Sequence, residues 1–491
     1  MAYKHGTYGV LTATANAASN SASVVVYVGT APINKIAGQA GKIPELVNKP
    51  LKITGLLSAR KLLGYSEKAD FAKYTLCEAV EAHFKNSLDT VGPIYVINVF
   101  NPNEGAADAE PVTLTVTKKI AKFTLGDMIL DTLVVGEGLT AGTDYELSYD
   151  SVSDVVTIKM LGETIPTTVK VSGKVAATDS ISATDIIGEI QETGEKTGLK
   201  AIADIYGIYS DIVNVIAAPG FSETPAVYEA MIETAKKLNG HWDAFVNADI
   251  PVGASTNTIA KAIAWKKENG YNEGISKVYW PMAKRTDGKT FHLSTLATYE
   301  MQKQDLSNDG VPFVSVSNKE TDVADFYGGT GFHAYDIEDA NILNTEGITT
   351  LVKAGGVFRL WGPHTAAFNF EDQESGELDP VYQFDSSIRT MLHITNRFQA
   401  DNFDDIDKPM TMALKDQILV REQSKLDTLK SMGALIGEPI VFFSDDNDAE
   451  SLSKGDFVWD IQTTTATPFK SGTVKVGYTS AGIYTLLGEE A

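Results

Sequence analysis

The stretch 341–369, NILNTEGITTLVKAGGVFRLWGPHTAAFN, decides how the whole chain is interpreted. Apolar residues at roughly helical spacing predict a helix in its first half. They are Ile342, Leu343, Ile348, Leu351 and Val352. Gly355 and Gly356 are expected to end that helix, because glycine adopts the left-handed conformation that closes a helix. Residues 357–361 predict a short strand before Pro363. Alone, the pattern is typical of any helix-to-strand unit of an α/β domain.

Apolar strands alternate with helical patterns on both sides of this stretch. Strands are predicted at 24–28, 94–99, 244–251, 278–281 and 313–316. Helices are predicted at 71–84, 256–269 and 294–304, and another around Val227 to Leu238. This alternation predicts an α/β fold with a mainly parallel sheet, flanking helices and right-handed crossovers.

Two regions depart from this alternation of strands and helices. Residues 104–198 carry alternating strands separated by Gly, Asp and Ser turns, which predicts a small inserted all-β, Ig-like domain. The C-terminal third predicts an α+β domain. The expected organisation is an N-terminal arm (1–22), a first core part (23–103), the β insert (104–198), the α/β core (199–370), the C-terminal domain (371–472) and a C-terminal arm (473–491).

Composition limits the classes of function. The 491-residue chain has 41 basic and 64 acidic residues and a net charge of −23, which argues against binding to a phosphate backbone. Cys77 is the one cysteine, so no internal disulfide can form, and it is expected to be a buried core thiol. The N-terminal residues lack the apolar segment of a signal peptide, so folding in a cytoplasm is expected.

Searches for catalytic and metal patterns give weak candidates. Ser255 lacks the second flanking glycine of a nucleophile elbow and is expected to cap the 256–269 helix. The GKT at 288–290 lacks the earlier glycine of a P-loop, because Ala283 stands there. The seven histidines show no H-x-x-x-H spacing, and the acidic runs 401–407 and 445–450 lack the EF-hand pattern. The expectation is no catalytic residue, no metal and no cofactor.

Ordered landmarks make the chain resemble the contractile tail sheath proteins of bacteriophages and phage-tail-like particles, whose core is called subtilisin-like. They are VVVYVGTAP (24–32), DIVNVIAAPG (211–220), AFVNADIP (244–251), KVYWPMAK (277–284), HLSTLATYEMQKQD (292–305), DGVPFVSVSN (309–318), RLWGPHT (359–365) and KSMGALIGEPIVFF (430–443). Together they span roughly residues 1–100 and 200–491, and the β insert is the variable part.

The resemblance implies a structural subunit rather than an enzyme. It implies hexameric rings stacked as a helical homo-oligomer around a tail tube, which contract to drive the tube through the bacterial envelope. Implied partners are further copies, the tail tube protein, and baseplate and tail terminator proteins, with neither nucleic-acid contact nor membrane insertion. The implied location is the virion tail, assembled in the host cytoplasm.

The resemblance also assigns roles to segments. The arms would add strands to neighbouring subunits, through Tyr3, Tyr8, Val10, Leu11, Val474, Val476, Tyr478, Ile483 and Tyr484. A half-exposed strand is therefore expected at 473–487. The accepting strands would lie at 440–443 and 456–460 and include Val441, Phe442, Phe457 and Trp459. The tube-facing residues would be Lys415, Arg421, Lys425 and Lys430.

Two other interpretations stay open on the sequence. One is the sheath of an R-type bacteriocin or another contractile injection particle, which the residues do not distinguish from a phage tail. The other is a soluble α/β hydrolase, which requires a nucleophile and a base within reach of each other.

Overall fold

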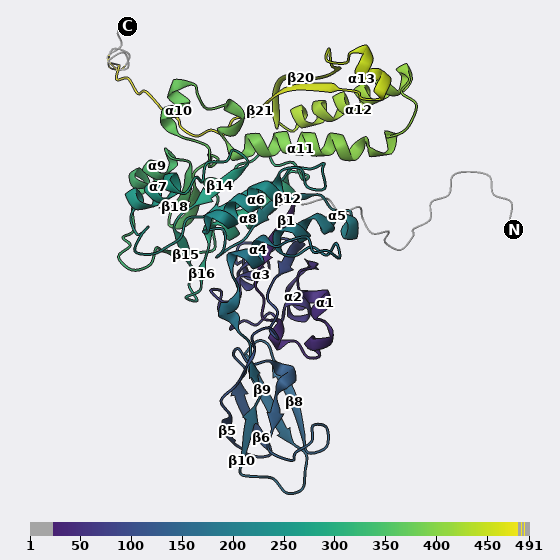
Figure 1. Cartoon of the computed structure of the whole chain (residues 1–491). Helices are drawn as coiled ribbons and strands as arrows, with labels where there is room; N and C mark the ends of the chain where they lie inside the picture. Colours follow the sequence, from purple (N-terminus) through teal and green to yellow (C-terminus); the bar gives the residue numbers. More distant parts are fainter. Residues whose placement is uncertain (1–22, 480–482, 484–485, 487–491) are drawn as a thin grey trace, which may run out of the picture.

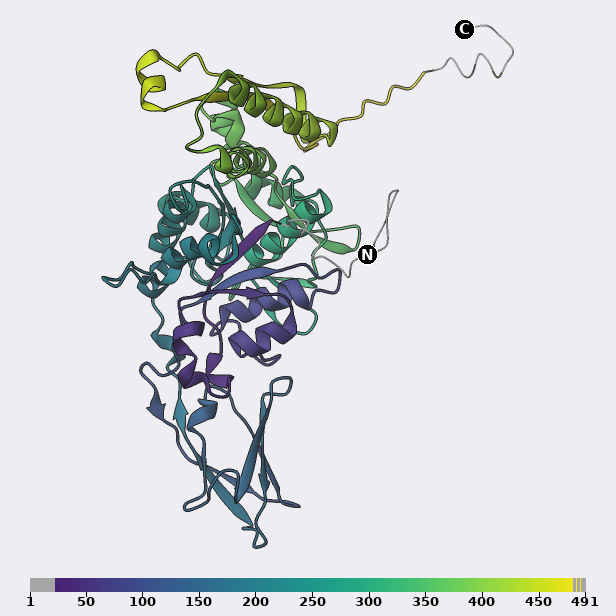
Figure 2. The same ribbon diagram turned by 90° about the vertical axis from the view of Figure 1, so that its right-hand side faces the viewer.

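The computed structural model describes residues 23–479 together with 483 and 486. Three parts are stacked along its long direction (Figure 1). A small β module lies at one end, an α/β body in the middle, and a layer made of two long helices and a hairpin at the other end. Figure 2 shows the same order after a quarter turn.

The body is built on an eight-stranded sheet in the order β19-β18-β14-β13-β12-β1-β3-β2. These strands are β19 (Val357–Trp361), β18 (Ile348–Ala354), β14 (Ser276–Tyr279), β13 (Phe245–Asp249), β12 (Val213–Ala217), β1 (Val24–Gly29), β3 (Ile94–Asn98) and β2 (Pro50–Ile53). The six inner strands are parallel, and β19 and β2 are antiparallel edges. The predicted mainly parallel sheet is therefore confirmed.

Helices cover both faces of this sheet, which explains why the sequences of its strands are continuous apolar runs. Val25 and Tyr27 of β1 face one core with α3 and α8, and Val26 and Val28 face the other with α6 and α7. The body helices are α1 (Ile43–Leu46), α2 (Leu56–Leu63), α3 (Thr75–Phe84), α4 (Ala183–Ile187), α5 (Asp204–Tyr209), α6 (Pro225–Ala235), α7 (Ile259–Glu268), α8 (Leu293–Ser307), α9 (Ile337–Asn344) and α10 (Phe370–Ser375). Cys77 is buried in α3, as expected.

The predicted helix over 342–352 is wrong in its second half. Helix α9 ends at Asn344, and residues 348–354 form β18. Gly355 and Gly356, with φ of 63° and 87°, make the two-residue turn of the β18–β19 hairpin instead of a helix end. The β-branched run Ile348-Thr349-Thr350 fits a fully buried strand, and periodicity over so few residues cannot separate a buried strand from a helix. The predicted strand at 357–361 is confirmed.

Two other predicted elements differ from the structure. Residues 313–316 form no strand; the chain reaches the sheet a few residues later, where the Asn318 and Thr321 amides donate to the Leu360 and Phe358 carbonyls of β19. Helix α7 begins at Ile259, and Thr258 rather than Ser255 caps it by accepting a hydrogen bond from the Lys261 amide. The hydroxyl of Thr256 donates instead to the carbonyl of Pro251.

The inserted module has two antiparallel three-stranded sheets, β5-β10-β7 and β6-β9-β8, and a two-stranded β11-β4 pair. Its strands are β4 (Ala107–Asp108), β5 (Val112–Thr115), β6 (Ile120–Thr124), β7 (Val134–Val135), β8 (Tyr145–Asp150), β9 (Val155–Met160), β10 (Thr168–Ser172) and β11 (Lys174–Val175). Residues from both three-stranded sheets share one apolar core, which includes Val135, Val156 and Val171. Ile186 of α4 belongs to the core of the body, so the chain has returned there by that point.

A buried ion pair joins the module to the body. The Lys35 ammonium lies 2.7 Å from the Asp154 carboxylate, and the two side chains are 3% and 5% exposed. Asp154 also accepts a hydrogen bond from the Tyr149 hydroxyl at 2.8 Å. The Asp131 carboxylate accepts from the amides of Gly38 and Gln39 at 2.7 Å. Polar contacts from several elements thus fix the module on the body.

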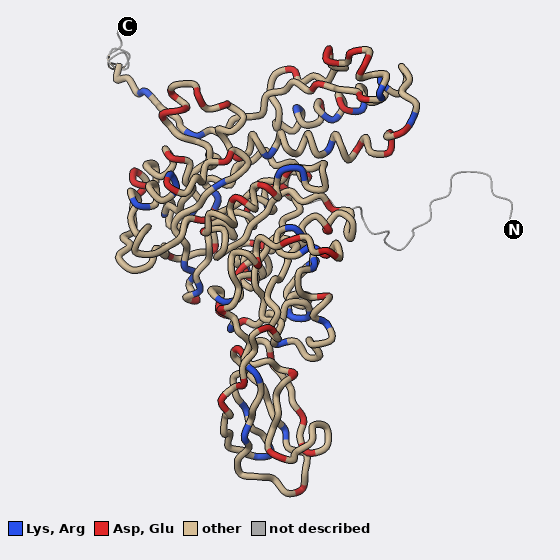
Figure 3. Tube along the Cα trace, viewed as in Figure 1, with Lys and Arg blue, Asp and Glu red and all other residues tan. Residues whose placement is uncertain are grey.

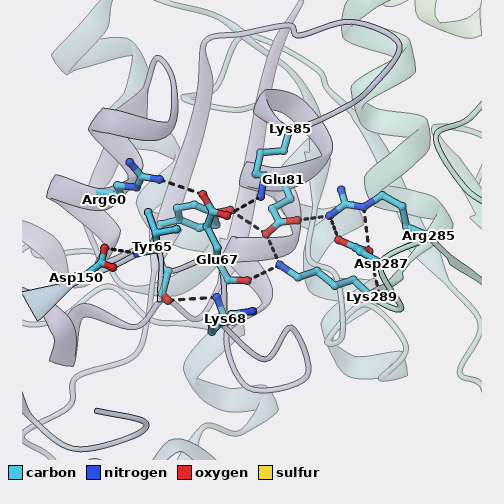
Figure 4. Close-up of polar contacts among 12 residues, drawn as sticks. Arg60, Tyr65, Glu67, Lys68, Glu81, Lys85, Asp150, Arg285, Asp287 and Lys289 are labelled. Carbon is cyan, nitrogen blue, oxygen red and sulfur yellow. Dashed lines mark hydrogen bonds and ion pairs between the residues drawn. The ribbon is translucent and has the colours of Figure 1, made fainter. Parts of the chain in front are cut away.

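A second charged cluster lies inside the body (Figure 4). Glu81 of α3 is fully buried and pairs with Arg285 and Lys289. These two residues flank the turn between β15 (Met282–Lys284) and β16 (Thr290–Phe291), which form a small sheet with β17 (Asp325–Tyr327). Glu67 pairs with Arg60 at 3.2 Å and Lys85 at 3.1 Å. The cluster holds α2, α3 and this hairpin together, because an unpaired buried carboxylate would be costly.

The third part, called here the C-terminal layer, consists of α11 (Asp385–Asp401), α12 (Met412–Ser431), β20 (Leu435–Phe443), α13 (Ala449–Lys454) and β21 (Trp459–Thr465). Two buried ion pairs fix α11 to the body. Lys277 of β14 lies 2.9 Å from Asp385, and both side chains are at most 2% exposed. One turn later, Arg389 pairs with Asp305 of α8.

We expect Lys35→Met to lower the free energy of unfolding by roughly 3–5 kcal/mol, because it leaves the Asp154 carboxylate buried without its cation. Methionine keeps the length of the side chain, so packing changes little. Urea denaturation measures the effect. Lys42→Met, the same change at a nearby exposed lysine, should leave stability almost unchanged; equal losses in both variants would contradict this role of the ion pair.

Candidate assembly surfaces

The β20–β21 hairpin contains the predicted accepting residues. Val441 and Trp459 pack in a core with Leu426 of α12 and Ile394 of α11. Phe442 pairs with Asp460 across the hairpin. The predicted second strand, 456–460, has the wrong bounds, because β21 spans Trp459–Thr465. Phe457 therefore precedes the strand, and the Thr-rich run up to Thr465 carries the pairing instead.

The C-terminal segment is extended but lies in no sheet in the described residues 466–479. Val474, Val476 and Tyr478 are 83%, 88% and 86% exposed. The strand predicted from their alternation is thus absent from the described part of that segment, where none of the described strands pairs with it. Ile483 is also exposed. Tyr484 and the N-terminal candidates Tyr3, Tyr8, Val10 and Leu11 lie outside the described residues.

The described chain starts at the junction between the body and the C-terminal layer. The hydroxyl of Ser23 donates to the carboxylate of Asp305, which pairs with Arg389 of α11. The side-chain amide of Gln302 donates to the Ser23 carbonyl at 3.0 Å. Ser23 is therefore bonded to α8 at the point where α8 meets α11.

A groove runs along α11 beside β21. Its first part, about 320 Å³, is lined by Met391, Ile394 and Phe398 of α11 and by Trp459 and Ile461 of β21. A larger part of about 1150 Å³ continues past Phe398 and Trp459 towards α13. Nothing in the sequence indicated this groove, because its walls come from segments some 60 residues apart.

The polar cluster around His292 most resembles an active site, but its contacts are structural rather than catalytic. His292 contacts the Glu78 carboxylate at 2.8 Å and the Glu223 carboxylate at 3.3 Å, rather than a hydroxyl. Burial alone would lower the pKa of His292, but the two carboxylates outweigh it and raise that pKa well above its usual value. Ser222 and Ser294 both donate to Asp249 instead. A charged imidazolium bound by two acids cannot activate a serine as a general base.

Within the described residues no group of His, Cys, Asp and Glu side chains is arranged to hold a metal ion. The same residues contain no helix long and apolar enough to cross a membrane.

Comparison with known proteins gives one consistent family. The tail sheath protein of Burkholderia phage BcepMu is 26% identical over 493 residues, which cover 95% of this chain and 94% of that protein. The tail sheath protein of Escherichia phage P2 is 26% identical over 302 residues, 60% of this chain and 70% of that protein. The chain is a contractile tail sheath protein. It is a subunit of a sheath and not an enzyme.

The fold of this sheath protein agrees with solved sheath structures. The helical sheath of the anti-feeding prophage in its contracted state has a TM-score of 0.55, with 14% identity, and the match covers 96% of this chain and 98% of that one. No family model matches the sequence.

The four basic residues predicted to face a tube all lie on α12 of the sheath protein, but each already has an acidic partner. Arg421 lies 2.6 Å from Asp405, and Lys425 lies 2.8 Å from both Asp401 and Glu422. Lys415 contacts Asp416 at 3.5 Å and Lys430 contacts Glu438 at 2.9 Å. Acidic and basic residues are therefore interleaved along the chain of this layer (Figure 3).

Asp249 gives the sheath protein a defined pH dependence. Burial raises the pKa of its carboxyl from 3.8 to about 6, so the folded state binds this proton more tightly than the unfolded state. The resulting stability is complete below pH 3.8 and is lost as the pH rises through about 6. Between these values the wild type should lose up to roughly 3 kcal/mol relative to Asp249→Asn. Urea denaturation of both proteins across this pH range measures the difference, and a constant difference would contradict the assignment.

Proposed function

We propose that this chain polymerises as stacked hexameric rings around a tail tube and that the polymer contracts to drive the tube through a bacterial envelope. The observation that carries the proposal is the exposed apolar C-terminal segment in a chain that also presents an incompletely paired hairpin. The relatives named as tail sheath proteins, and the neighbour solved as a contracted helical sheath, support it.

Strand exchange between copies would hold such a polymer together. A two-stranded hairpin on its own is only marginally stable. An extended segment gains main-chain hydrogen bonds when it joins a sheet edge. Val474, Val476, Tyr478, Ile483 and Tyr484 would be donated from the C-terminal arm. The N-terminal arm would contribute Tyr3, Tyr8, Val10 and Leu11, and the hairpin of Val441, Phe442 and Trp459 would accept them.

Contraction then needs no nucleotide. Copies linked by strands can rotate and separate without dissociating, because main-chain pairing persists while the linkers before each strand change direction. The extended polymer would be metastable and would convert to a second packing with more extensive interfaces. Head-to-tail contacts of this kind form helical filaments rather than closed oligomers.

The proposed partners are other copies, the tail tube protein, and baseplate and terminator proteins, and the proposed location is the tail of a virion. Direct binding to nucleic acid is not proposed, since the net charge is −23. For the tube we propose α12 as the contact. Lys430 is the most available of its predicted basic residues, because its partner Glu438 is 92% exposed and can move away.

Deleting residues 473–491 should leave a folded monomer that forms no tubes. A sharper test replaces the apolar side chains alone. Val474→Asn with Val476→Asn should reduce tube formation by at least about tenfold, since these exposed groups would otherwise be buried in a neighbour. Thr473→Asn with Lys475→Asn changes the intervening positions and should still polymerise. Negative-stain microscopy and sedimentation provide the measurement, and equal polymerisation of both double variants would refute strand exchange through this face.

Lys430→Glu should weaken assembly on purified tail tubes without unfolding the monomer. Lys454→Glu is the matched control, because Lys454 is an exposed lysine of α13 paired with Glu450. The tube-bound fraction in co-sedimentation should fall for Lys430→Glu alone, and the difference should shrink as salt is added. If the two variants bind tubes equally well at every salt concentration, α12 does not contact the tube through Lys430.

A further inference from the structure

Two short helices lie at opposite ends of the central sheet. Helix α2 packs on β2, the strand at one end, and α9 packs on β18, next to the strand at the other end. Figure 1 shows the two helices on opposite sides of the body. Ala59 of α2 belongs to the core on one face of the sheet, and Leu343 of α9 belongs to the core on the other face. The outer surfaces of α2 and α9 therefore cannot meet within one copy.

Each of these helices exposes one apolar and one charged side chain that lie a turn apart. In α2 they are Leu57, which is 81% exposed, and Lys61. In α9 they are Glu338 and Ile342, of which the isoleucine is 50% exposed. Residues four apart are neighbours on one helix face. The apolar residue comes first in α2 and second in α9, so antiparallel packing of the two helices joins apolar to apolar and lysine to glutamate.

The exposed apolar side chains support this match. Leu57 has the largest exposed fraction of any large apolar side chain in the described part of the body. A single exposed leucine is common on protein surfaces, but the α9 side offers an apolar surface to cover it. Phe370, which is 45% exposed, lies at the end of α9, because its amide donates to the Thr345 carbonyl at 2.8 Å. Contact between the two sides would remove apolar area of both from water.

The charges around the two helices are complementary. Residues 336–379, which include α9, carry nine acidic and two basic side chains, and among the described residues Glu346 is the only one of these acids in an ion pair. Residues 23–103, which include α2, carry six acidic and nine basic side chains. Lys61 forms no ion pair in the described chain, whereas the neighbouring Arg60 does. Copies with a net charge of −23 repel one another, so contact between an acidic and a basic surface is favoured.

We propose that α2 of one copy packs antiparallel on α9 of the next copy. Leu57 then lies against Ile342, and Lys61 lies against Glu338. Because the two surfaces differ, the contact is head-to-tail, and each copy uses one surface towards each of two neighbours. The inference rests on the polymer proposed above and adds a contact between the bodies of neighbouring copies that involves no exchanged strand.

A charge swap tests this contact. Lys61→Glu and Glu338→Lys should each raise the concentration at which the full-length chain forms tubes by at least about tenfold, because each places like charges opposite one another. The double variant restores opposite charges and should polymerise within about twofold of the wild type. Lys122→Glu makes the same charge change at an exposed lysine of β6 in the module and should polymerise normally. Urea denaturation checks that every monomer is folded.

Cysteine trapping tests the direction of the contact. Leu57→Cys and Ile342→Cys in one chain, in a Cys77→Ala background, should give ladders on non-reducing gels after mild oxidation of the tubes. Neither single variant should give cross-linked dimers, because each position meets a different position of the neighbour. A mixture of the two single variants should give dimers and no longer products.

The outcomes separate this contact from strand exchange. Tubes that form normally after either charge reversal, or a double variant as defective as the single ones, would overturn the packing of α2 on α9 and leave the proposed sheath intact. Dimers from Leu57→Cys alone, or the absence of ladders from the double cysteine variant, would overturn it too. If the wild-type chain forms no tubes, the proposed polymerisation fails and this contact fails with it.

Discussion

The β20–β21 hairpin, which has only two strands in the described residues, is the constraint on which the proposed assembly depends. A strand that pairs on one side only presents N–H and C=O groups that water must satisfy until another strand arrives. Most folded proteins cover or blunt such edges. Here the β20 edge is blunted, because the Gln423 side chain of α12 accepts a hydrogen bond from the Val441 amide and donates one to the Pro439 carbonyl. The β21 strand lies beside an apolar groove.

The rest of the fold holds this edge in place. Asp385 and Arg389, one turn apart on α11, form buried ion pairs with Lys277 of the central sheet and Asp305 of α8. Ser23, the first described residue, binds the same Asp305. The segment that leads to the N-terminus and the helix beneath the accepting edge therefore share one anchoring point in the body. Buried ion pairs also link elements within the body. His292, for example, contacts the carboxylates of Glu78 and Glu223.

Much of the architecture could be predicted from the sequence. The continuous apolar runs of β1, β3 and β13 predicted a covered parallel sheet, and the order of short landmarks pointed to the sheath family. The helix expected over residues 342–352 was wrong because a short buried strand and a helix face have the same apolar content. Residues 313–316 formed no strand, and the backbone bonds to β19 begin only at Asn318, which depends on tertiary structure.

The candidate site was less predictable. The alternation of Val474, Val476 and Tyr478 predicted a half-exposed strand, but the described residues of that segment form none and these side chains are exposed. The basic residues of α12 were visible in the sequence, whereas their acidic partners Asp401, Asp405 and Glu438 were not recognisable as such. Gln423 gave no signal, because a glutamine on a helix is ordinary until the strand beside it is known.

A cryo-electron-microscopy reconstruction of tubes formed by the full-length chain tests the central claim most directly. The account predicts continuous main-chain density for an additional strand against the outer edge of β21, traceable to a different copy, with apolar side chains directed at α11. A hairpin that stays two-stranded in the assembled tube, with copies in contact through side chains alone, would contradict it.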